Sequence, residues 1–362
     1  MKRKRQPGFF DIAERTAKLT QMGDPLVGLN ERINWEAFRP DLARVHEKDR
    51  KSNAGAKPID VVLMFKLLVL QQLHNLSDDR IEYQVRDRLS FMRFLGLQLE
   101  DRVPDAKTVW LFREHLKELE LVETLFTRFH EQLASRGYVA QAGQMIDATF
   151  VEVPRQRNTR EENAQIKAGE TPAEWQQPAQ KFKLRQKDVD ARWTKKNHEK
   201  HYGYLCPLGY KNHVNADQGN KLVQSYEVSN AAVHDSQVFE TLLDQAEDEE
   251  GKKRAIYADS AYRSQEKEAK LAEASIPSHI CEKGARNHPL TAKQKASNTE
   301  KSRIRVRVEH VFGAQAQMGG HIVRTIGLLR AWVKIGMMNL VYNMVRLGQL
   351  LRRDGSGAPV VA

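Results

Sequence analysis

The first 137 residues carry the hydrophobic spacing of α-helices. Apolar positions recur at helical intervals over residues 61–73, and a second helical run follows Ser77, which is suited to cap it. A third run begins after Pro104, and a fourth covers about residues 122–134. This pattern predicts an all-helical N-terminal domain over residues 1–137.

The third of these helices has the size and charge of a DNA-recognition helix. Asp105 or Thr108 can cap its N-terminus, and Arg113 lies on its outward face. The spacing alone fits a plain helical bundle equally well. Because the whole chain is basic, the balance tips slightly towards DNA, and Lys107, Thr108 and Arg113 are candidate DNA contacts.

From Gly143 onward, short β-prone segments alternate with helical ones. Strands are predicted at 144–151, 210–216, 222–228 and 254–258, a hairpin turn at 217–220, and helices at 236–247, 265–274 and 331–351. This alternation predicts an α/β domain over residues 138–352, followed by a disordered tail at 353–362.

A basic insertion interrupts this domain at about residues 155–204. Its few large aliphatic residues and many lysines and arginines are typical of an insertion or a mobile basic loop. Lys195 and Lys196 are candidate DNA contacts within it. Trp175 has a ring that can stack on an unpaired base, although packing within the insertion is the favoured interpretation.

The composition of the chain indicates what kind of molecule it binds. The 362 residues include 58 Lys and Arg against 47 Asp and Glu, a formal net charge of +11, which favours a polyanion such as nucleic acid. The two cysteines, Cys206 and Cys281, are too few for a disulfide framework and are typical of a reducing cytosol. Pro7 and Asp11 interrupt the start of the chain where a signal peptide is apolar, and the most apolar stretch, 59–73, is shorter than the ~20 residues that span a bilayer. We therefore expect a cytoplasmic protein without a membrane span.

Three acids each break the pattern around them. Asp147 lies inside an apolar strand, Asp259 ends another, and Glu309 lies in a basic helical run beside Val308 and Phe312. An acid inside a strand is desolvated unless a cation neutralises it, so two strand acids and a third from a helix predict a divalent metal site. Oxygen ligands favour Mg²⁺ or Mn²⁺. Taken singly, each acid is more often a structural ion pair or a cap, so the prediction depends on the three together.

The histidines favour structural roles. The spacing H-x2-H-x4-C-x6-H fits no standard zinc site; it is made by His198, His201, Cys206 and His213. His234-Asp235-Ser236 is suited to cap the next helix, and an approach of His234 to the metal site is the less favoured alternative.

Several ordered motifs give the chain a resemblance to the DDE transposases of bacterial insertion sequences, in particular the insertion-sequence-five family. In the N-terminal part the matching segments are GDPL at 23–26, INWEAFRP at 33–40, VPDAKT at 103–108 and FR at 112–113. In the catalytic part they are MIDAT at 145–149, GYKNH at 209–213, ADSAYRS at 258–264 and RVEHVFG at 307–313. The resemblance covers nearly the whole chain.

The resemblance implies a ribonuclease-H-like catalytic domain, a mixed sheet flanked by helices, preceded by the all-helical N-terminal domain. Asp147 is implied on its first strand, Asp259 after its fourth and Glu309 on a helix, as catalytic ligands of two Mg²⁺ ions, with Mn²⁺ possible. Related enzymes carry a Tyr-x2-Arg-x3-Glu-x6-Lys signature, of which Arg305 and Glu309 are present, whereas Ser302 and Ala316 replace the Tyr and the Lys. DNA contacts of those two side chains therefore do not carry over.

Further candidate DNA contacts lie close to these motifs. Lys211 is part of GYKNH, and Arg263 and Arg305 are near the acids in sequence. An arginine fork suits bidentate phosphate binding. A buried ion pair explains either arginine equally well.

The implied function is that of a DNA transposase, a magnesium-dependent endonuclease and strand-transfer enzyme acting in DNA recombination, associated with the bacterial nucleoid. It binds the terminal inverted repeats of a transposable element, cleaves at its ends and joins the 3′ hydroxyls to target DNA, with a homodimer expected on the double-stranded DNA. One alternative is a catalytically inactive, transposase-derived DNA-binding protein, against which the presence of all three acids argues. Another is a nuclease of the same fold that does not join ends.

Overall fold

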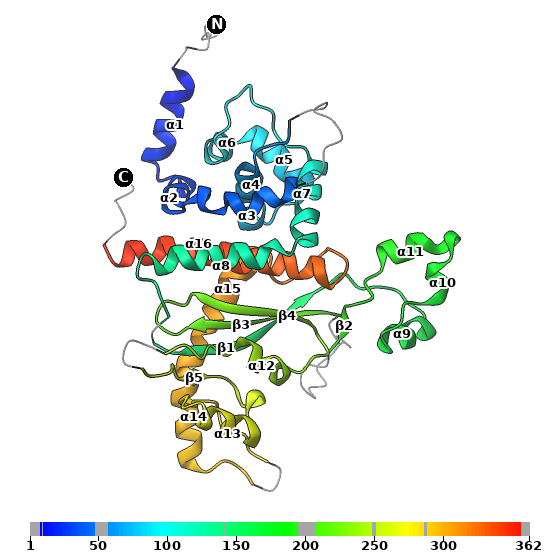
Figure 1. Cartoon of the computed structure of the whole chain (residues 1–362), viewed down its shortest axis with the longest axis vertical. Helices are drawn as coiled ribbons and strands as arrows, with labels where there is room; N and C mark the ends of the chain where they lie inside the picture. The colour runs from blue at the N-terminus through cyan, green and yellow to red at the C-terminus, as the bar shows by residue number, and fades with distance from the viewer. Residues whose placement is uncertain are drawn as a thin grey trace, which may run out of the picture. The chain divides into compact units, whose positions relative to one another are not determined.

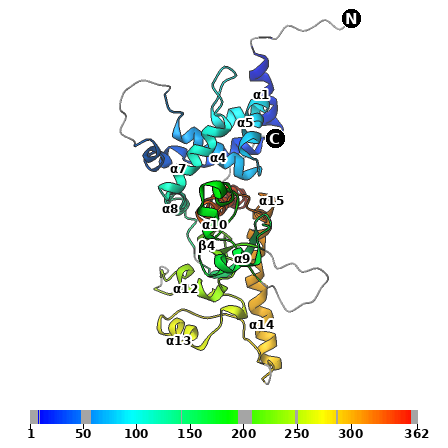
Figure 2. The ribbon, with the colours of Figure 1, turned by 90° about the vertical axis from the view of Figure 1, so that its right-hand side faces the viewer.

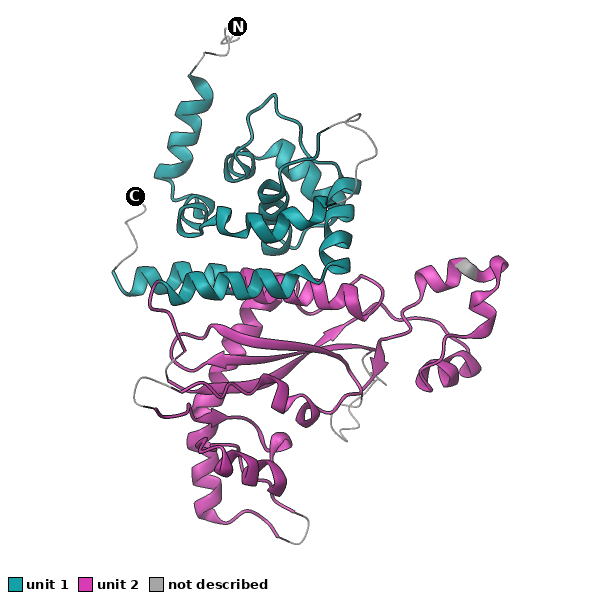
Figure 3. Ribbon diagram, viewed as in Figure 1, with its two compact units in different colours: residues 1–135, 343–362 teal, residues 136–342 magenta. Residues whose placement is uncertain are grey.

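The computed structural model describes residues 8, 10–47, 57–140, 142–194, 208–247, 251–285 and 288–355. The chain forms two compact units, coloured separately in Figure 3. Unit 1 comprises Met1–Ser135 with Asn343–Ala362, and unit 2 comprises Arg136–Tyr342. The boundary falls inside the last helix, α16 (Leu328–Arg353). The sequence pattern assigns all of this helix to the second domain, but its residues from Asn343 onward group with unit 1, where Asn343 Nδ2 lies 3.3 Å from His130 Nε2.

Unit 1 is built from helices, as expected (Figure 1). They are α1 (Asp11–Gln21), α2 (Pro25–Arg32), α3 (Arg39–Ala43), α4 (Val61–Leu73), α5 (Asp78–Asp87), α6 (Leu89–Leu95), α7 (Ala106–Glu118) and α8 (Leu121–Ala134), with 3₁₀ turns at Trp35–Phe38 and Arg44–His46. The structure confirms the four predicted helices as α4, α5, α7 and α8. Ser77 caps α5, and Asp105, not Thr108, caps α7 by accepting a hydrogen bond of 2.7 Å from the Thr108 N–H.

The core of unit 1 forms around α4. This helix is apolar on nearly all sides, which is typical of a helix surrounded by others, and most of its residues are buried. Aromatic rings pack against it: the centroid of Phe65 lies 4.9 Å from that of Phe38 and 6.0 Å from that of Trp35. Trp35 also packs edge-on against Phe94 of α6 at 5.6 Å.

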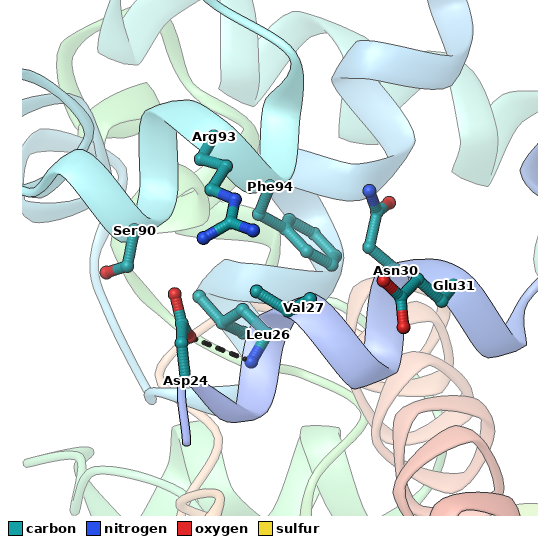
Figure 4. Close-up of a pocket in the computed structure, with 8 residues that line it drawn as sticks. All are labelled: Asp24, Leu26, Val27, Asn30, Glu31, Ser90, Arg93 and Phe94. Carbon is teal, nitrogen blue, oxygen red and sulfur yellow. Dashed lines mark hydrogen bonds between the residues drawn. The ribbon is translucent and has the colours of Figure 1, made fainter. Parts of the chain in front are cut away.

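A small pocket of about 110 Å³ lies between α2 and α6. Figure 4 shows its lining residues, which are Asp24, Leu26, Val27, Asn30, Glu31, Ser90, Arg93 and Phe94. Asp24 caps α2 through the Leu26 N–H, and Arg93 donates a 2.6 Å hydrogen bond to Thr20 Oγ1 of α1. The polar groups here connect helices, and none of the predicted site residues lies among them.

Unit 2 contains a five-stranded sheet. Its strands are β1 (Gln144–Glu152), β2 (Arg192–Trp193), β3 (Leu208–Asp217), β4 (Val223–Asn230) and β5 (Ile256–Tyr257). β3 pairs antiparallel with β1, β2 and β4, and β5 pairs parallel with β1 on its other side. Since β2 belongs to the basic insertion, β5 is the fourth strand of the central sheet, as the resemblance implies.

Helices flank both faces of this sheet. Those of unit 2 are α9 (Arg160–Lys167), α10 (Ala173–Gln176), α11 (Lys181–Gln186), α12 (Phe239–Leu242), α13 (Gln265–Glu273), α14 (Ala292–Arg305), α15 (Glu309–Gln317) and the start of α16. Figure 2 shows α12 and α13 on the opposite side of unit 2 from α14 and α15. Because side chains alternate along a strand, Ile146 of β1 packs in the core with Phe239 and Leu271, whereas Val151 packs in the core with Ile335 of α16.

The predicted helix over 236–247 is wrong in extent. A 3₁₀ turn spans Asp235–Gln237, and α12 ends at Leu242. Its end is fixed by side chains of the sheet: Asn215 Nδ2 donates to the Leu242 carbonyl at 2.8 Å, and the amide of Gln144 bonds both the N–H and the carbonyl of Asp244. These hydrogen bonds satisfy backbone groups that a longer helix would have used.

The basic insertion carries helices α9 to α11 where the sequence suggested an insertion or a mobile loop. Trp175 is fully buried there, and its Nε1 donates a 2.8 Å hydrogen bond to Glu162 Oε1 of α9. This confirms the packing interpretation of Trp175 over base stacking. Within the described ranges, no helix combines the length and apolarity needed to cross a membrane.

Candidate active site

The three acids come from separate elements of unit 2. Asp147 lies within β1, Asp259 lies two residues after β5 and caps the 3₁₀ turn Ser260–Tyr262, and Glu309 is the first residue of α15. The parallel ladder pairs Gln144 with Ile256 and Met145 with Tyr257. Continued by two residues past the end of the ladder, this register would place Asp147 level with Asp259, at the same edge of the sheet.

The carboxylates interact electrostatically. The pKa of Asp147 is raised to about 6, mainly by burial and to a lesser extent by the negative charges of Asp259 and Glu309, while Arg305 and the Ala148 N–H act in the opposite direction. The Asp147 side chain is 14% exposed, so this burial is substantial. Asp259 and Glu309, which are far from Asp147 in sequence, are therefore near enough in the fold to disfavour its charged form.

Arg305 is the counter-ion of Asp147. Its Nη1 lies 2.5 Å from Asp147 Oδ2, while Asp147 Oδ1 accepts the Ala148 N–H at 2.9 Å. Arg305 ends α14, and the 3₁₀ turn Val306–Val308 then leads directly to Glu309. Val308 and Phe312 are buried, as the sequence predicts, whereas Glu309 is exposed and does not line the cleft that the spacing suggested for it. Of the two roles open for Arg305 from the sequence, the structure shows an ion pair.

The chemistry of these donors fits a divalent cation. Three hard carboxylates, two of which raise the pKa of the third, are stabilised by positive charge. In this structure two of the carboxylates are hydrogen-bonded to protein groups: Asp147 Oδ2 accepts from Arg305, and Asp259 Oδ1 accepts the Ala261 N–H at 2.6 Å. Over the part of the chain that the structure describes, no three His, Cys, Asp or Glu side chains are arranged to hold a metal ion.

The raised pKa of Asp147 makes the stability of the metal-free protein depend on pH. Its folded value of about 6 exceeds the ordinary 3.8, so the native state binds this proton more tightly than the unfolded chain. Asp147 therefore contributes stability that is fully present below about pH 4 and is lost as the pH rises through 6. We expect Asp147→Asn, which mimics the protonated form, to match the wild type at pH 4 and to exceed its unfolding free energy by about 2–3 kcal/mol at pH 7. Urea unfolding with EDTA at both pH values measures this, and a pH-independent difference contradicts it.

A cleft of about 490 Å³ opens beside Asp259 and Arg305. Its other lining residues are Ser260, Cys281, Glu282, Lys283, Gly284, Leu290, Asn298 and Ser302. Ser302, which stands where related enzymes have a tyrosine, is in contact with Cys281, whose Sγ lies 3.6 Å from Ser302 Oγ. Of these lining residues, the sequence indicated Lys283 only as part of a basic segment and did not indicate that it lies beside the acids.

The candidate DNA contacts of α7 differ in their surroundings. Lys107 is exposed in the first turn, and Thr108 is half-buried. Arg113 forms a bidentate ion pair with Asp78 of α5, both distances being 2.7 Å. This arginine therefore connects two helices of unit 1.

The remaining candidates lie in unit 2. Lys211 donates to Asp235 Oδ1 at 2.8 Å and to the Val233 carbonyl at 2.7 Å. Arg263 donates to the Ile280 carbonyl at 3.2 Å, and its Nε lies 3.4 Å from Glu268 Oε1. Of the two roles that the sequence allowed for Arg263, phosphate binding and an ion pair, the structure shows the ion pair. Lys195 and Lys196 fall outside the described residues.

Asp235 and Tyr262 are residues near the site that the sequence did not single out. The Tyr262 hydroxyl is buried without a hydrogen-bond partner among the described residues. Burial raises the pKa of Tyr262, and Asp147, Asp235 and Asp259 add to this effect. Tyr262 was detectable as part of the ADSAYRS motif, whereas Asp235 gave no signal beyond its place after a histidine.

The histidines have the structural roles expected of them. His234 Nδ1 accepts the Ser236 N–H at 3.3 Å and so caps the 3₁₀ turn. Burial lowers the pKa of His213 to about 4, which leaves it neutral at pH 7, and its Nε2 lies 2.8 Å from Ser229 Oγ. The other members of the rejected zinc pattern, His198, His201 and Cys206, lie outside the described residues.

Three buried amides hold α15 against the sheet. Asn212 Nδ2 of β3 donates to Gln315 Oε1 of α15 at 3.1 Å, and Gln315 Nε2 donates to Asn339 Oδ1 of α16 at 2.7 Å. Asn339 Nδ2 closes the triangle by donating to Asn212 Oδ1 at 3.1 Å. The network supports the helix that begins with Glu309.

A mixed sheet flanked by helices, with acids on a central strand, after its parallel neighbour and on an adjacent helix, defines a ribonuclease-H-like domain of the DDE type. Residues 141–344 match the family model described as Transposase DDE domain, and residues 14–115 match the one described as Transposase domain (DUF772). The chain therefore belongs to the DDE transposases, a family of DNA-binding enzymes that use divalent metal ions.

The cryo-EM structure of the piggyBac transposase synaptic complex with hairpin DNA is similar at a TM-score of 0.48 and 12% sequence identity, over 95% of this chain and 79% of that chain.

Proposed function

We propose that the protein cleaves DNA at the terminal inverted repeats of an insertion sequence of the insertion-sequence-five family and transfers the 3′ hydroxyl ends to target DNA. The observation that carries the proposal is that Asp259, after β5, and Glu309, on α15, both act electrostatically on Asp147 of β1, in a chain that matches both transposase models. Helical unit 1, with the exposed Lys107 on α7, is proposed to contact the repeats and to pair two protomers.

The proposed mechanism assigns one role to the three acids. Asp147, Asp259 and Glu309 would hold two Mg²⁺ or Mn²⁺ ions, which activate an attacking oxygen and stabilise the leaving oxygen of an in-line phosphodiester displacement. The acids supply anchoring charge from rigid elements, and the amides of Asn212 and Gln315 keep α15 in position. With water as nucleophile the site exposes a 3′ hydroxyl, and with that hydroxyl as nucleophile the same site joins the end to target DNA.

A labelled duplex bearing the element's terminal repeat, incubated with the full chain and a target plasmid, tests the proposal. We expect cleavage and joining with Mg²⁺ or Mn²⁺ and neither reaction with EDTA. Binding without cleavage identifies an inactive derivative, and cleavage without joining identifies a nuclease. Light scattering of the complex should give two protomers, and joining by a complex of one protomer would contradict the dimer.

The insertion is expected to bind DNA phosphates. Lys167 of α9 and Arg185 of α11 are exposed. Removing both, as Lys167→Ala and Arg185→Ala, should weaken binding and make the slope of log K against log [salt] shallower by about 2, one for each phosphate that is no longer neutralised. Fluorescence anisotropy at several salt concentrations measures the slope. Lys270→Ala is the matched control because Lys270 is ion-paired with Glu240 and Glu266, and an unchanged slope in the double variant would remove the insertion from the interface.

A further inference from the structure

We propose that Arg305 is a displaceable counter-ion that couples DNA binding to metal binding. In the DNA-free protein its guanidinium holds Asp147, and a DNA phosphate entering the cleft draws the guanidinium away and frees the carboxylate for a divalent ion. The inference rests on the proposed role of Asp147 as a metal ligand.

Both oxygens of the Asp147 carboxylate already accept hydrogen bonds. Oδ2 bonds Arg305 at 2.5 Å, and Oδ1 accepts the Ala148 N–H. A charge-assisted bond of this length between side chains that are 24% and 14% exposed is stronger than a surface ion pair. A divalent ion that binds Asp147 through Oδ2 therefore competes with the guanidinium.

Arg305 has unused bonding capacity. Its Nε is buried without a hydrogen-bond partner among the described residues, and the side chain lines the 490 Å³ cleft. Ser302 and Lys283 of the same wall add donors for a phosphate oxygen. If the guanidinium turns from Asp147 to a phosphate, it keeps an anionic partner and can form two parallel hydrogen bonds with it.

Asp259 and Glu309 both disfavour the charged form of Asp147, so a cation beside Asp147 stabilises its carboxylate. Arg305 supplies that charge before DNA binds. Because binding free energies are linked, DNA must raise the affinity for metal by the factor by which metal raises the affinity for DNA.

Mn²⁺ titrations of the full chain followed by electron paramagnetic resonance test the coupling without relying on catalysis. The DNA is a terminal-repeat duplex that already ends in its 3′ hydroxyl, and Mn²⁺ bound by DNA alone is subtracted. For the wild type we expect Mn²⁺ affinity to rise about tenfold or more when this duplex is present. For Arg305→Gln we expect about tenfold tighter Mn²⁺ binding without DNA, and little further gain with it.

Matched variants separate the possible failures. Arg305→Lys keeps the charge and should retain part of the coupling, whereas Arg303→Gln, exposed on the same helix, should behave as the wild type. Unchanged or weaker Mn²⁺ binding by a folded Arg305→Gln, or retained coupling in it, overturns the proposal. If Arg305→Gln does not fold, Arg305→Lys serves as the test. The proposal is then overturned if the duplex raises the Mn²⁺ affinity of Arg305→Lys as much as that of the wild type. If Asp147→Asn binds Mn²⁺ as the wild type does, the assignment of the metal ligands fails instead.

Discussion

Each of the substitutions Asp147→Asn, Asp259→Asn and Glu309→Gln should lower the rates of end cleavage and joining by more than about 10³-fold while leaving DNA binding within a few-fold of wild type. The amides keep the shape of the side chains but remove the charge that anchors the metal ions. Because the acids act as one unit, a double variant should be no slower than the slower of its single variants. Gel assays with a pre-formed protein–DNA complex separate the rate from binding.

Glu282→Gln is the matched control for this series. Glu282 lines the same cleft but interacts with the Asn298 side chain through its backbone, and it is not among the proposed ligands. It should retain most of the activity. An acid variant that keeps a tenth or more of the wild-type rate would exclude that acid from the metal site.

The helices and strands that the sequence predicted well are those fixed by local patterns. The helix over 61–73 matches α4 because its apolar positions and the Asp60 cap lie within the segment itself. β1 likewise follows from a short β-prone run between Gly143 and Pro154. The helix over 236–247 was overextended because Gln144 and Asn215, distant in sequence, capture its backbone.

The acids of the site were detectable, but their surroundings were not. Asp147 could be singled out because an acid inside an apolar strand has an unusual desolvation cost. Its ion pair with Arg305 spans 158 residues, and no local pattern indicates a contact of that kind. The same holds for Arg113 and Lys211, whose basic character suggested DNA while the fold supplies Asp78 and Asp235 as partners. Charge in a sequence therefore indicates the kind of partner, and only the fold shows which charges are already paired.

Breaking the amide triangle behind α15 should lower both stability and activity. Gln315 is 1% exposed, and Gln315→Leu leaves the amides of Asn212 and Asn339 with fewer partners in a dry environment. We expect unfolding free energy to fall by about 2–4 kcal/mol, since broken hydrogen bonds and unsatisfied buried groups both contribute. Activity should fall as well, because α15 carries Glu309.

Gln317→Leu provides the matched control. Gln317 lies two residues further along the same helix and is exposed, so the same change in chemistry should alter the unfolding free energy by no more than about 0.5 kcal/mol. Urea unfolding of both variants, together with end cleavage in the presence of Mg²⁺, measures the difference. Equal effects of the two substitutions would show that the triangle does not hold α15. The position of Glu309 would then depend on Val308 and Phe312, two buried residues next to it in sequence.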